Sequence, residues 1–122
     1  MSRSDELKKS VESLNARDFV GASKEFSDTV KFHAPGLGLD IEGRDTMMGH
    51  VGDFVRQADV HYEIGGEVVE HGPFAVIFTR STGNLEGQRM EWEICEVVRY
   101  EGDQIAEVWA LRGGPPRPTS SS

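Results

Sequence analysis

The second half of the chain is a run of strand-like stretches, and this run limits the folds that the chain can adopt. Four stretches are rich in β-branched and aromatic residues, and short turns that contain glycine separate them. They cover residues 61–70, with an interruption at Gly65-Gly66, and residues 74–82, 88–100 and 104–112. Successive strands joined by tight turns pair antiparallel, so three consecutive hairpins predict an antiparallel and strongly curved sheet.

The first half of the chain carries helical patterns instead. Residues 4–15 place apolar side chains at positions i, i+4 and i+7, after a predicted N-cap at Ser4. Helices that come first and strands that come last predict an α+β domain with the helices packed on one face of the sheet. A curved sheet around helices leaves a concavity, which predicts a ligand pocket. A shorter helix, a strand and a third helix are predicted over residues 18–26, 29–34 and 44–58.

Length and charge narrow the possible functions. The 122 residues predict a single domain over residues 1–112, followed by a disordered tail at 113–122, which is rich in Gly, Pro and Ser. The formal net charge of −8 argues against nucleic acids and anionic membranes, which bind clustered basic surfaces. Small neutral or cationic ligands and other proteins remain possible partners. The N-terminus lacks the apolar segment of a signal peptide, so we expect a cytoplasmic protein.

The cysteine and histidine content argues against a disulfide or metal framework. Cys95 is the single cysteine, which excludes an internal disulfide and a Cys-based zinc cluster. His61 and His71 do not have the spacing of metal ligands, and we expect neither a metal nor a cofactor. Cys95 is interpreted as a small buried hydrophobe and not as a nucleophile, because no basic residue flanks it in the sequence.

Four short segments carry a family resemblance: residues 14–18 (LNARD), 32–36 (FHAPG), 42–45 (EGRD) and 104–109 (QIAEVW). Through them the chain resembles the nuclear transport factor 2-like superfamily, in particular SnoaL-like polyketide cyclases and ketosteroid isomerases, over about residues 4–109. The resemblance implies a cone-shaped α+β barrel, in which a curved, mostly antiparallel sheet wraps around about three N-terminal helices. Because this superfamily hosts isomerases, cyclases, hydrolases, dehydratases and binding modules, the fold does not determine the activity.

The catalytic residues that the resemblance implies are missing. The isomerase pattern places its oxyanion-hole tyrosine on Ser10, its general-base aspartate on Ala34 and its second oxyanion donor on Cys95. These positions have lost the chemistry; an alanine methyl group, for example, cannot abstract a proton. SnoaL-like cyclases carry an aspartate directly after the last-strand tryptophan, where this chain has Ala110. Limonene epoxide hydrolases use an Arg-x-Asp pair, and residues 80–82 here read Arg-Ser-Thr.

The same alignment predicts which side chains line the pocket. If Ala34 and Cys95 face inward, the two-residue period of a strand turns their alternate neighbours inward as well, Glu91 and Glu93 included. The last strand then contributes its even-numbered residues, and the helices contribute their apolar stripes. The predicted ligand-binding residues are Ser10, Phe32, Ala34, Val51, Phe54, Phe74, Val76, Phe78, Arg80, Cys95, Val97, Val108 and Ala110.

Polar side chains in this apolar pocket are the candidates for chemistry. His50 and Glu93 are the predicted proton-transfer pair, and Arg112 completes the predicted catalytic set as the group that stabilises an anion, with Arg80 as the alternative. A buried charge needs a partner, so we expect Glu93 to pair with one of the two arginines. Other interpretations stay open. His50 can be a satisfied core or pocket-rim histidine, and Glu93 can face solvent if the register slips by one residue. The arginines can neutralise a buried acid or lie at the mouth of the cone.

The opposite face of the sheet predicts a homodimer. Large apolar side chains alternate with the pocket-facing ones, and exposed apolar patches of this kind are commonly used as interfaces. His33 also falls on this outward face. The predicted dimer residues are Met90, Trp92, Ile94 and Trp109.

Two main hypotheses of function follow. The first is a pocket enzyme of the isomerase, cyclase or hydrolase type that acts without a cofactor on a small apolar metabolite with a carbonyl or epoxide group. The second is a non-catalytic module of the same fold that binds a small ligand or a protein partner, and a purely structural dimerisation domain is a third possibility. The loss of every family catalytic set favours the second hypothesis, and the inward polar residues favour the first.

Overall fold

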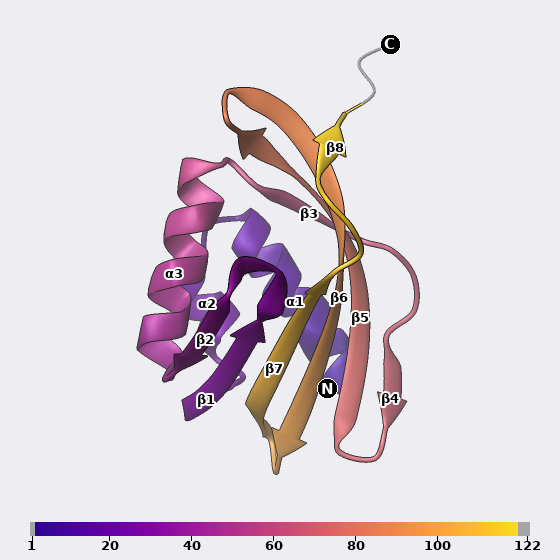
Figure 1. Cartoon of the computed structure of the whole chain (residues 1–122). Helices are drawn as coiled ribbons and strands as arrows, with labels where there is room; N and C mark the ends of the chain where they lie inside the picture. Colours follow the sequence, from indigo (N-terminus) through magenta and orange to yellow (C-terminus); the bar gives the residue numbers. More distant parts are fainter. Residues whose placement is uncertain (1, 120–122) are drawn as a thin grey trace.

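A computed structural model describes residues 2–119 of the chain (Figure 1). The elements follow the predicted order of two helices, a strand, a third helix and a final run of strands, with a short strand inserted before the third helix. The helices are α1 (Arg3–Asn15), α2 (Phe19–Ser23) and α3 (Arg44–Gln57), and a 3-10 turn, η1, spans Pro35–Leu37. The strands are β1 (Phe26–Ala34), β2 (Leu39–Glu42), β3 (His61–Ile64), β4 (Val69–His71), β5 (Phe74–Leu85), β6 (Gln88–Glu101), β7 (Gln104–Arg112) and β8 (Arg117–Pro118).

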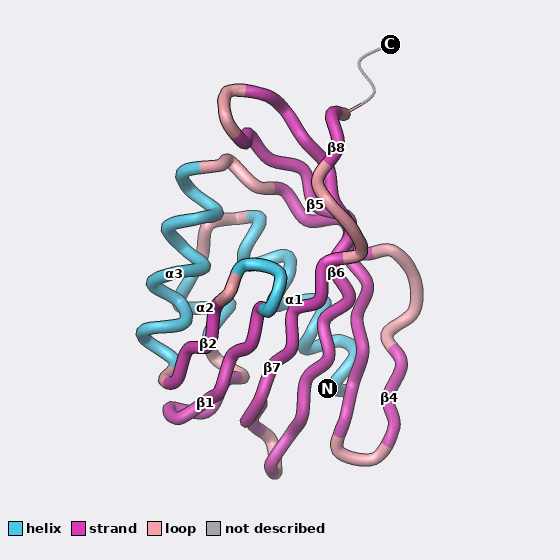
Figure 2. The backbone as a smooth tube through the Cα atoms, in the orientation of Figure 1, coloured by secondary structure: helices cyan, strands magenta, loops and turns pink. Residues whose placement is uncertain are grey.

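All the strands of residues 2–119 belong to one sheet. The strand order is β2-β1-β7-β6-β5-β3, with β4 paired to β5 and β8 paired to β6. The pair β1–β7 is parallel, and the other pairs are antiparallel. The sheet is strongly curved and open, with β2 and β3 at its two edges (Figure 2). The predicted α+β class is therefore confirmed, whereas the barrel implied by the family resemblance is an open cone.

The core lies between the concave face of the sheet and the helices that cover it (Figure 1). Val30 of β1 and Val98 of β6 are fully buried there, against Leu7 of α1 and Met47 of α3. A second cluster forms around Trp92 of β6, which packs against the end of α3 and the start of the following segment. Each fully buried aliphatic side chain of this kind stabilises the fold by about 1.5–3 kcal/mol relative to an exposed one.

The helix ends differ in detail from the predicted ones. The N-cap of α1 is Ser2 and not Ser4, because the Ser2 hydroxyl accepts the backbone N–H of Asp5 at 3.2 Å. Helix α2 is shorter than predicted and is capped by Asp18, because the chain already enters β1 at Phe26. None of the helices in residues 2–119 is long and apolar enough to cross a lipid bilayer.

The β5–β6 hairpin turns later than predicted. We predicted a turn at Gly83-Asn84, yet β5 continues past this point and the chain turns at Glu86 and Gly87, which have φ values of 52° and 80°. A Cβ at Gly83 would lie 3.1 Å from the Ala58 carbonyl oxygen and 3.1 Å from the Trp92 ring. This glycine therefore permits close packing inside a strand and does not form a turn.

The segment after β7 is ordered as far as the structure describes it, although we predicted disorder. Its strand β8 pairs with Met90 and Glu91 of β6. The Arg117 guanidinium forms ion pairs with Glu91, at 3.3 Å, and with Glu93. Residues 113–119 therefore form a strap, a segment that lies along β6. The rest of the predicted tail, residues 120–122, lies outside the described residues.

Residues 14–18, one of the segments that carry the family resemblance, fasten α1 to the edge strand β3. The Asn15 side chain accepts the backbone N–H of Tyr62 at 2.8 Å and donates to the carbonyl of the same residue at 2.8 Å. Arg17, which has a φ of 62°, donates to the Val60 carbonyl at 2.7 Å. These two side chains replace the missing strand neighbour at this edge and fix the position of Tyr62.

Candidate functional site

A cavity of about 390 Å³ lies between the helices and the concave face of the sheet. Its walls are mostly apolar and come from the three helices, from η1 and from the six strands β1, β2, β3, β5, β6 and β7. Among the predicted ligand-binding residues, those that line it are Ser10, Phe32, Ala34, Val51, Phe54, Val108 and Ala110, and two of the predicted catalytic residues, His50 and Arg112, line it as well.

The orientation that we predicted for β5 and β6 is wrong by one residue. Ile77 and Thr79 of β5 and Ile94 of β6 face the cavity, whereas Phe78 lies on the opposite face and is 48% exposed. Both faces of these strands carry apolar residues, so the two-residue period alone does not decide which face is buried. The residues predicted to point inward that do not line the cavity are Phe74, Val76, Phe78, Arg80, Glu91, Glu93, Cys95 and Val97.

Glu96 is the one acidic side chain among the described residues that line the cavity. It projects from the middle of β6, where Ile77 of β5 and Ala110 of β7 are its neighbours in register. No hydrogen bond or ion pair to another described residue compensates its charge, and burial raises the pKa of the Glu96 carboxyl from its usual 4.5 to about 7. Near neutral pH this carboxyl is therefore present in both its protonated and its ionised form.

Tyr62 lies on the same wall of the cavity, on the edge strand β3. Burial and the negative charge of Glu96 raise the pKa of the Tyr62 hydroxyl above its usual range, and the Arg17 guanidinium opposes this shift only in part. The hydroxyl is therefore protonated at physiological pH and can donate a hydrogen bond. Thr79, which is 8% exposed, lines the wall between the strands of these two residues.

The mouth of the cavity carries two of the predicted catalytic residues, a histidine and an arginine, for both of which a position at the rim was left open by the sequence. His50 is exposed on α3, and Arg112 is exposed at the end of β7, beside η1. Both side chains line the cavity from its rim, and neither forms an ion pair within residues 2–119. His50 is therefore a pocket-rim histidine, which is one of the interpretations left open by the sequence.

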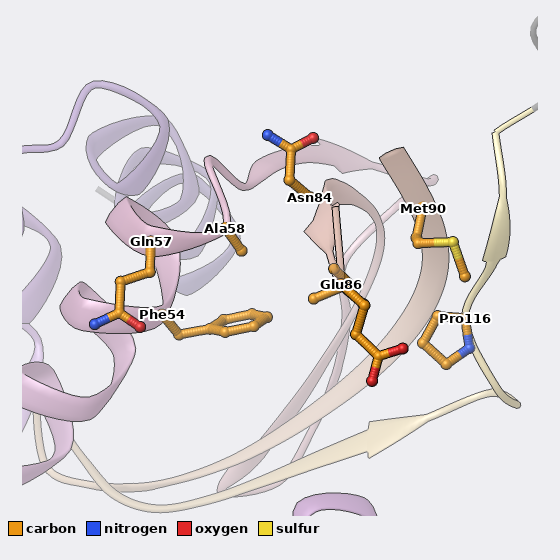
Figure 3. Close-up of a pocket in the computed structure, with 8 residues that line it drawn as sticks. Phe54, Gln57, Ala58, Asn84, Glu86, Met90 and Pro116 are labelled. Carbon is orange, nitrogen blue, oxygen red and sulfur yellow. The ribbon is translucent and has the colours of Figure 1, made fainter. Parts of the chain in front are cut away.

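A second hollow of about 520 Å³ opens beside this mouth (Figure 3). Phe54, Leu85 and Pro116 line both hollows, so the two meet at these three side chains. Figure 3 shows the Phe54 ring reaching from α3 toward Glu86. The ring centroid of Phe54 lies 6.1 Å from that of Trp92, which belongs to the inner wall. Phe54 therefore stands at the boundary between an outer vestibule and the inner cavity.

Glu93 does not meet the other members of the predicted catalytic set. It lies on the outer face of β6, where the Arg117 guanidinium donates to its carboxylate at 3.1 Å and lowers the pKa of that carboxyl. The expected pair with Arg112 or Arg80 is therefore wrong, because Arg80 pairs with Glu63 at 3.3 Å and Arg112 lies at the cavity mouth. The one-residue register slip left open by the sequence is what the structure contains.

The outer face of the sheet carries an apolar patch different from the predicted one. Trp92 is 5% exposed in the core, Ile94 lines the cavity and Met90 lines the second hollow, so none of the three lies on this face. Trp109 does, as predicted, and it stacks on His33 with ring centroids 5.6 Å apart. We call this surface the outer apolar patch, which comprises Val76, Phe78, Cys95, Val97, Trp109 and Leu111 in two rows across β5, β6 and β7.

His33, predicted to face outward, does so within an ion-pair network. Its imidazole contacts the carboxylates of Asp40 and Glu107, and both raise the pKa of the imidazole. Glu107 also accepts from Arg99 at 3.3 Å. These charges tie β2 to β1 and β7 and border the outer apolar patch.

Sequence reasoning missed Glu96 and Tyr62 as cavity residues. The numbering of the acids in β6 could have identified Glu96. Glu91 and Glu93 are odd-numbered and Glu96 is even-numbered, so Glu96 lies on the opposite face of the strand. Glu96 therefore shares its face with Trp92 and Val98, both of which are buried. A single acid among the apolar residues on one face of a long strand is the pattern that identifies Glu96 as a cavity residue. Tyr62 has no comparable signal, because it lies in a four-residue strand whose burial depends on α1.

The fold and the cavity together define a small α+β pocket protein in which helices cap an open, curved sheet. The sequence supports the same assignment, because residues 7–108 match the model of the SnoaL-like domain family. The chain belongs to this SnoaL-like family. No significant match was found among curated proteins.

Solved structures of several other proteins share this fold. Bal32a, from a soil-derived mobile gene cassette, has a TM-score of 0.81 and 15% identity, with 89% of this chain and 87% of that chain covered. A protein with a ketosteroid isomerase-like fold from Catenulispora acidiphila, in complex with trimethylamine, has a TM-score of 0.78, 13% identity and coverages of 89% and 85%. An LEH-like epoxide hydrolase from M. tuberculosis has a TM-score of 0.72, 14% identity and coverages of 89% and 80%. At these identities the likeness concerns the fold and not the activity.

Proposed function

We propose that this protein is an acid/base enzyme whose substrate is a small, largely apolar molecule with a carbonyl or epoxide group, and that Glu96 transfers the proton. The observation that carries the proposal is a single unpaired carboxyl, with a pKa of about 7, in a mostly apolar cavity of about 390 Å³. A general base is most effective when its pKa lies near the working pH. The loss of the family's usual base at Ala34 is compatible with this role, because Ala34 and Glu96 line the same cavity.

The mechanism needs two groups of this chain. For a ketone, the ionised Glu96 carboxylate takes a proton from the carbon next to the carbonyl. The electron pair of that C–H bond forms a C–C double bond, and the π pair of the carbonyl bond moves onto the oxygen. The Tyr62 hydroxyl, which is protonated, donates a hydrogen bond to the oxyanion that develops there. The protonated Glu96 then returns the proton to the same carbon or, when the ketone carries a β,γ double bond, to the γ carbon of the dienolate. For an epoxide, the same carboxylate takes a proton from a water molecule as the water oxygen attacks a ring carbon. The C–O bond of the ring breaks, and the resulting alkoxide takes a proton from solvent.

Proton exchange at carbon tests this proposal without knowledge of the natural substrate. We expect the protein to accelerate exchange of the protons next to the carbonyl of 2-tetralone with D2O, measured by proton NMR. Glu96→Gln should lower the rate by about 100-fold or more, because a positioned acid/base group contributes about 10²–10⁴-fold. Tyr62→Phe should lower it by about 100-fold, because one oxyanion donor is removed.

Glu93→Gln is the matched control for this experiment, because Glu93 belongs to the same strand but lies on the outer face. It should leave the exchange rate unchanged. Equal rates for the wild-type protein and the Glu96 variant would contradict the proposal. Binding of the ketone without exchange would favour the second hypothesis, a non-catalytic ligand-binding module. The predicted catalytic role of His50 stays a prediction, and His50→Gln in the same assay tests it.

We further propose that two copies of the chain pair through the outer apolar patch, as the sequence suggested for this face. Phe78 and Leu111 are 48% and 41% exposed there, and Trp109 lies beside them. Arg80 and Glu93 at one end, and Arg99 and Glu107 at the other, give the patch a charged border of both signs. A face of this kind is complementary to itself under a two-fold axis.

The oligomeric state in solution checks the dimer proposal. Leu111→Arg and Trp109→Arg should each give a monomer in sedimentation velocity, because a buried unpaired arginine is strongly unfavourable in an interface. Val20→Arg is the control, because Val20 is 75% exposed on α2, away from the sheet, and this variant should sediment like the wild-type protein. A monomeric wild-type protein, or a patch variant with unchanged sedimentation, would exclude this interface.

A further inference from the structure

The charged side chains of the cavity lie at two places, an acid at the inner wall and a cation at the rim. Its inner wall carries the acid Glu96 with the Tyr62 hydroxyl near it, and its rim carries Arg112 and His50. Among the described residues that line the cavity, Arg112 is the one with a permanent positive charge. A molecule that fills the cavity therefore meets a proton-transferring group at one end and a cation at the other.

Arg112 differs from the other arginines of residues 2–119, because it has no partner. Each of the others bonds to a carboxylate or to a backbone carbonyl. Of the two acids nearest to it in the sheet, Glu93 pairs with Arg117, and Glu96 forms no ion pair with Arg112. The chain around Arg112 is fixed as well, because the backbone N–H of Gly113 donates to the Glu93 carbonyl at 3.0 Å. An unneutralised guanidinium at a cavity rim, carried by a fixed backbone, is suited to an anionic group of a ligand.

The register of the sheet sets the separation of the two ends. Ala110 pairs with Glu96, and Arg112 follows two residues later on the same face of β7. Two residues of a strand span about 7 Å, so the two polar ends lie about one fused bicyclic ring apart. The wall between them is formed by apolar side chains such as Phe32, Val51 and Ile94.

We propose that the substrate is an apolar monocarboxylic acid, held with its carboxylate on Arg112 at the rim and its reactive carbonyl or epoxide at Glu96. This inference rests on the proposed function and adds the chemical class of the substrate. A carboxylate fits better than a phosphate, because one free guanidinium faces it and the protein has a net charge of −8, which disfavours a dianion. His50, on the facing helix α3, can donate a hydrogen bond to the same group.

Matched acid and amide ligands test this inference. We expect 2-naphthylacetate to bind the wild-type protein at least about tenfold more tightly than 2-naphthylacetamide, measured by isothermal titration calorimetry at pH 7.5, because charge-assisted hydrogen bonds are the stronger ones. In Arg112→Gln the two affinities should become equal. In the control Arg80→Gln the preference for the acid should persist, because Arg80 is exposed on the outer face and pairs with Glu63.

The outcomes separate this inference from the proposed function. Equal binding of acid and amide to the wild-type protein, or an acid preference that persists in Arg112→Gln, would overturn the carboxylate assignment. Binding of neither ligand would overturn it too. None of these results affects the exchange of 2-tetralone, which is neutral, so that assay decides the role of Glu96 by itself. Thermal melting of Arg112→Gln, whose side chain is exposed, should match that of the wild-type protein and excludes misfolding as the cause.

Discussion

Glu96→Gln should make the protein more stable at pH 8 and leave its stability nearly unchanged at pH 5. The wild-type carboxyl is ionised at pH 8 and lies in an apolar cavity without a partner, which is unfavourable for the folded state. Glutamine has the same shape and no charge. We expect the melting temperature to rise at pH 8 by at most about 10 °C, which corresponds to about 3 kcal/mol in the free energy of unfolding.

The direction of this effect follows from proton linkage. The pKa of Glu96 is about 7 in the folded protein and close to 4.5 in the unfolded chain. Between these two values the folded state binds more protons, so the free energy of unfolding falls as the pH rises from 4.5 to 7. At pH 5 most of this loss has not yet occurred, and removal of the carboxyl then changes little.

Differential scanning calorimetry of the wild-type and variant proteins at both pH values is the measurement. Glu93→Gln is the control of opposite sign, because Arg117 lowers the pKa of Glu93 and its ionised form supports the folded state at pH 8. Glu25 is unchanged in both variants, and burial with the nearby charge of Glu6 raises its pKa to about 7, so part of the pH dependence should persist. Equal destabilisation of Glu96→Gln at both pH values would contradict the assignment of an unpaired buried carboxyl.

Asn15→Ala should destabilise the protein by about 2 kcal/mol. Asn15 satisfies both the backbone N–H and the carbonyl of Tyr62, at 2.8 Å each, on the edge of the sheet. Alanine leaves both groups without a partner in a partly buried place, where each unpaired group costs about 1–3 kcal/mol before water compensates it in part. Because the same contact positions Tyr62, proton exchange of 2-tetralone should fall as well.

Chemical denaturation and the exchange assay together check this second prediction. Glu12→Ala, on an exposed part of the same helix, is the control and should change stability by less than about 0.5 kcal/mol. Asn15→Asp keeps the acceptor and loses the donor, so it should fall between the alanine variant and the wild-type protein. A stability of Asn15→Ala equal to that of the wild-type protein would show that α1 does not hold β3 in this way.

Much of the architecture could be predicted from the sequence because the relevant signals are local. The apolar stripe of Leu7, Val11 and Leu14 indicates α1, and the order of elements indicates the α+β class. The resemblance carried by residues 14–18 and 104–109 indicates the family. These signals do not depend on which residues meet across the sheet.

The orientation of β5 and β6 could not be predicted in the same way. Phe78 and Cys95 on one face and Ile77 and Ile94 on the other are all suited to burial. The choice between them is made by tertiary packing, here by Trp92 against Gly83 and by the helices on the concave face. An error of one residue in the orientation exchanges the two faces of both strands. For this reason the predicted site contained Glu93 in place of Glu96.

The predicted cavity residues on the helices, β1 and β7 line the cavity, whereas those on β5 and β6 do not. His50, Arg112, Phe54 and Ala110 lie on elements whose register the sequence marks clearly, and all of them line the cavity. The strap beyond Arg112 was missed because its composition is typical of disordered chains. Its order in the structure depends on ion pairs with β6, which composition does not reveal.

The pKa of Glu96 is the most direct test of the account. It can be measured from the side-chain carboxyl carbon resonances in a pH titration by NMR, with the Glu96 signal assigned by its absence in Glu96→Gln. We predict a pKa of about 7 for this residue, together with a lowered pKa for Glu93. A value for Glu96 near 4.5 would show a solvated or paired carboxyl and would contradict its role as the proton-transfer group of the cavity.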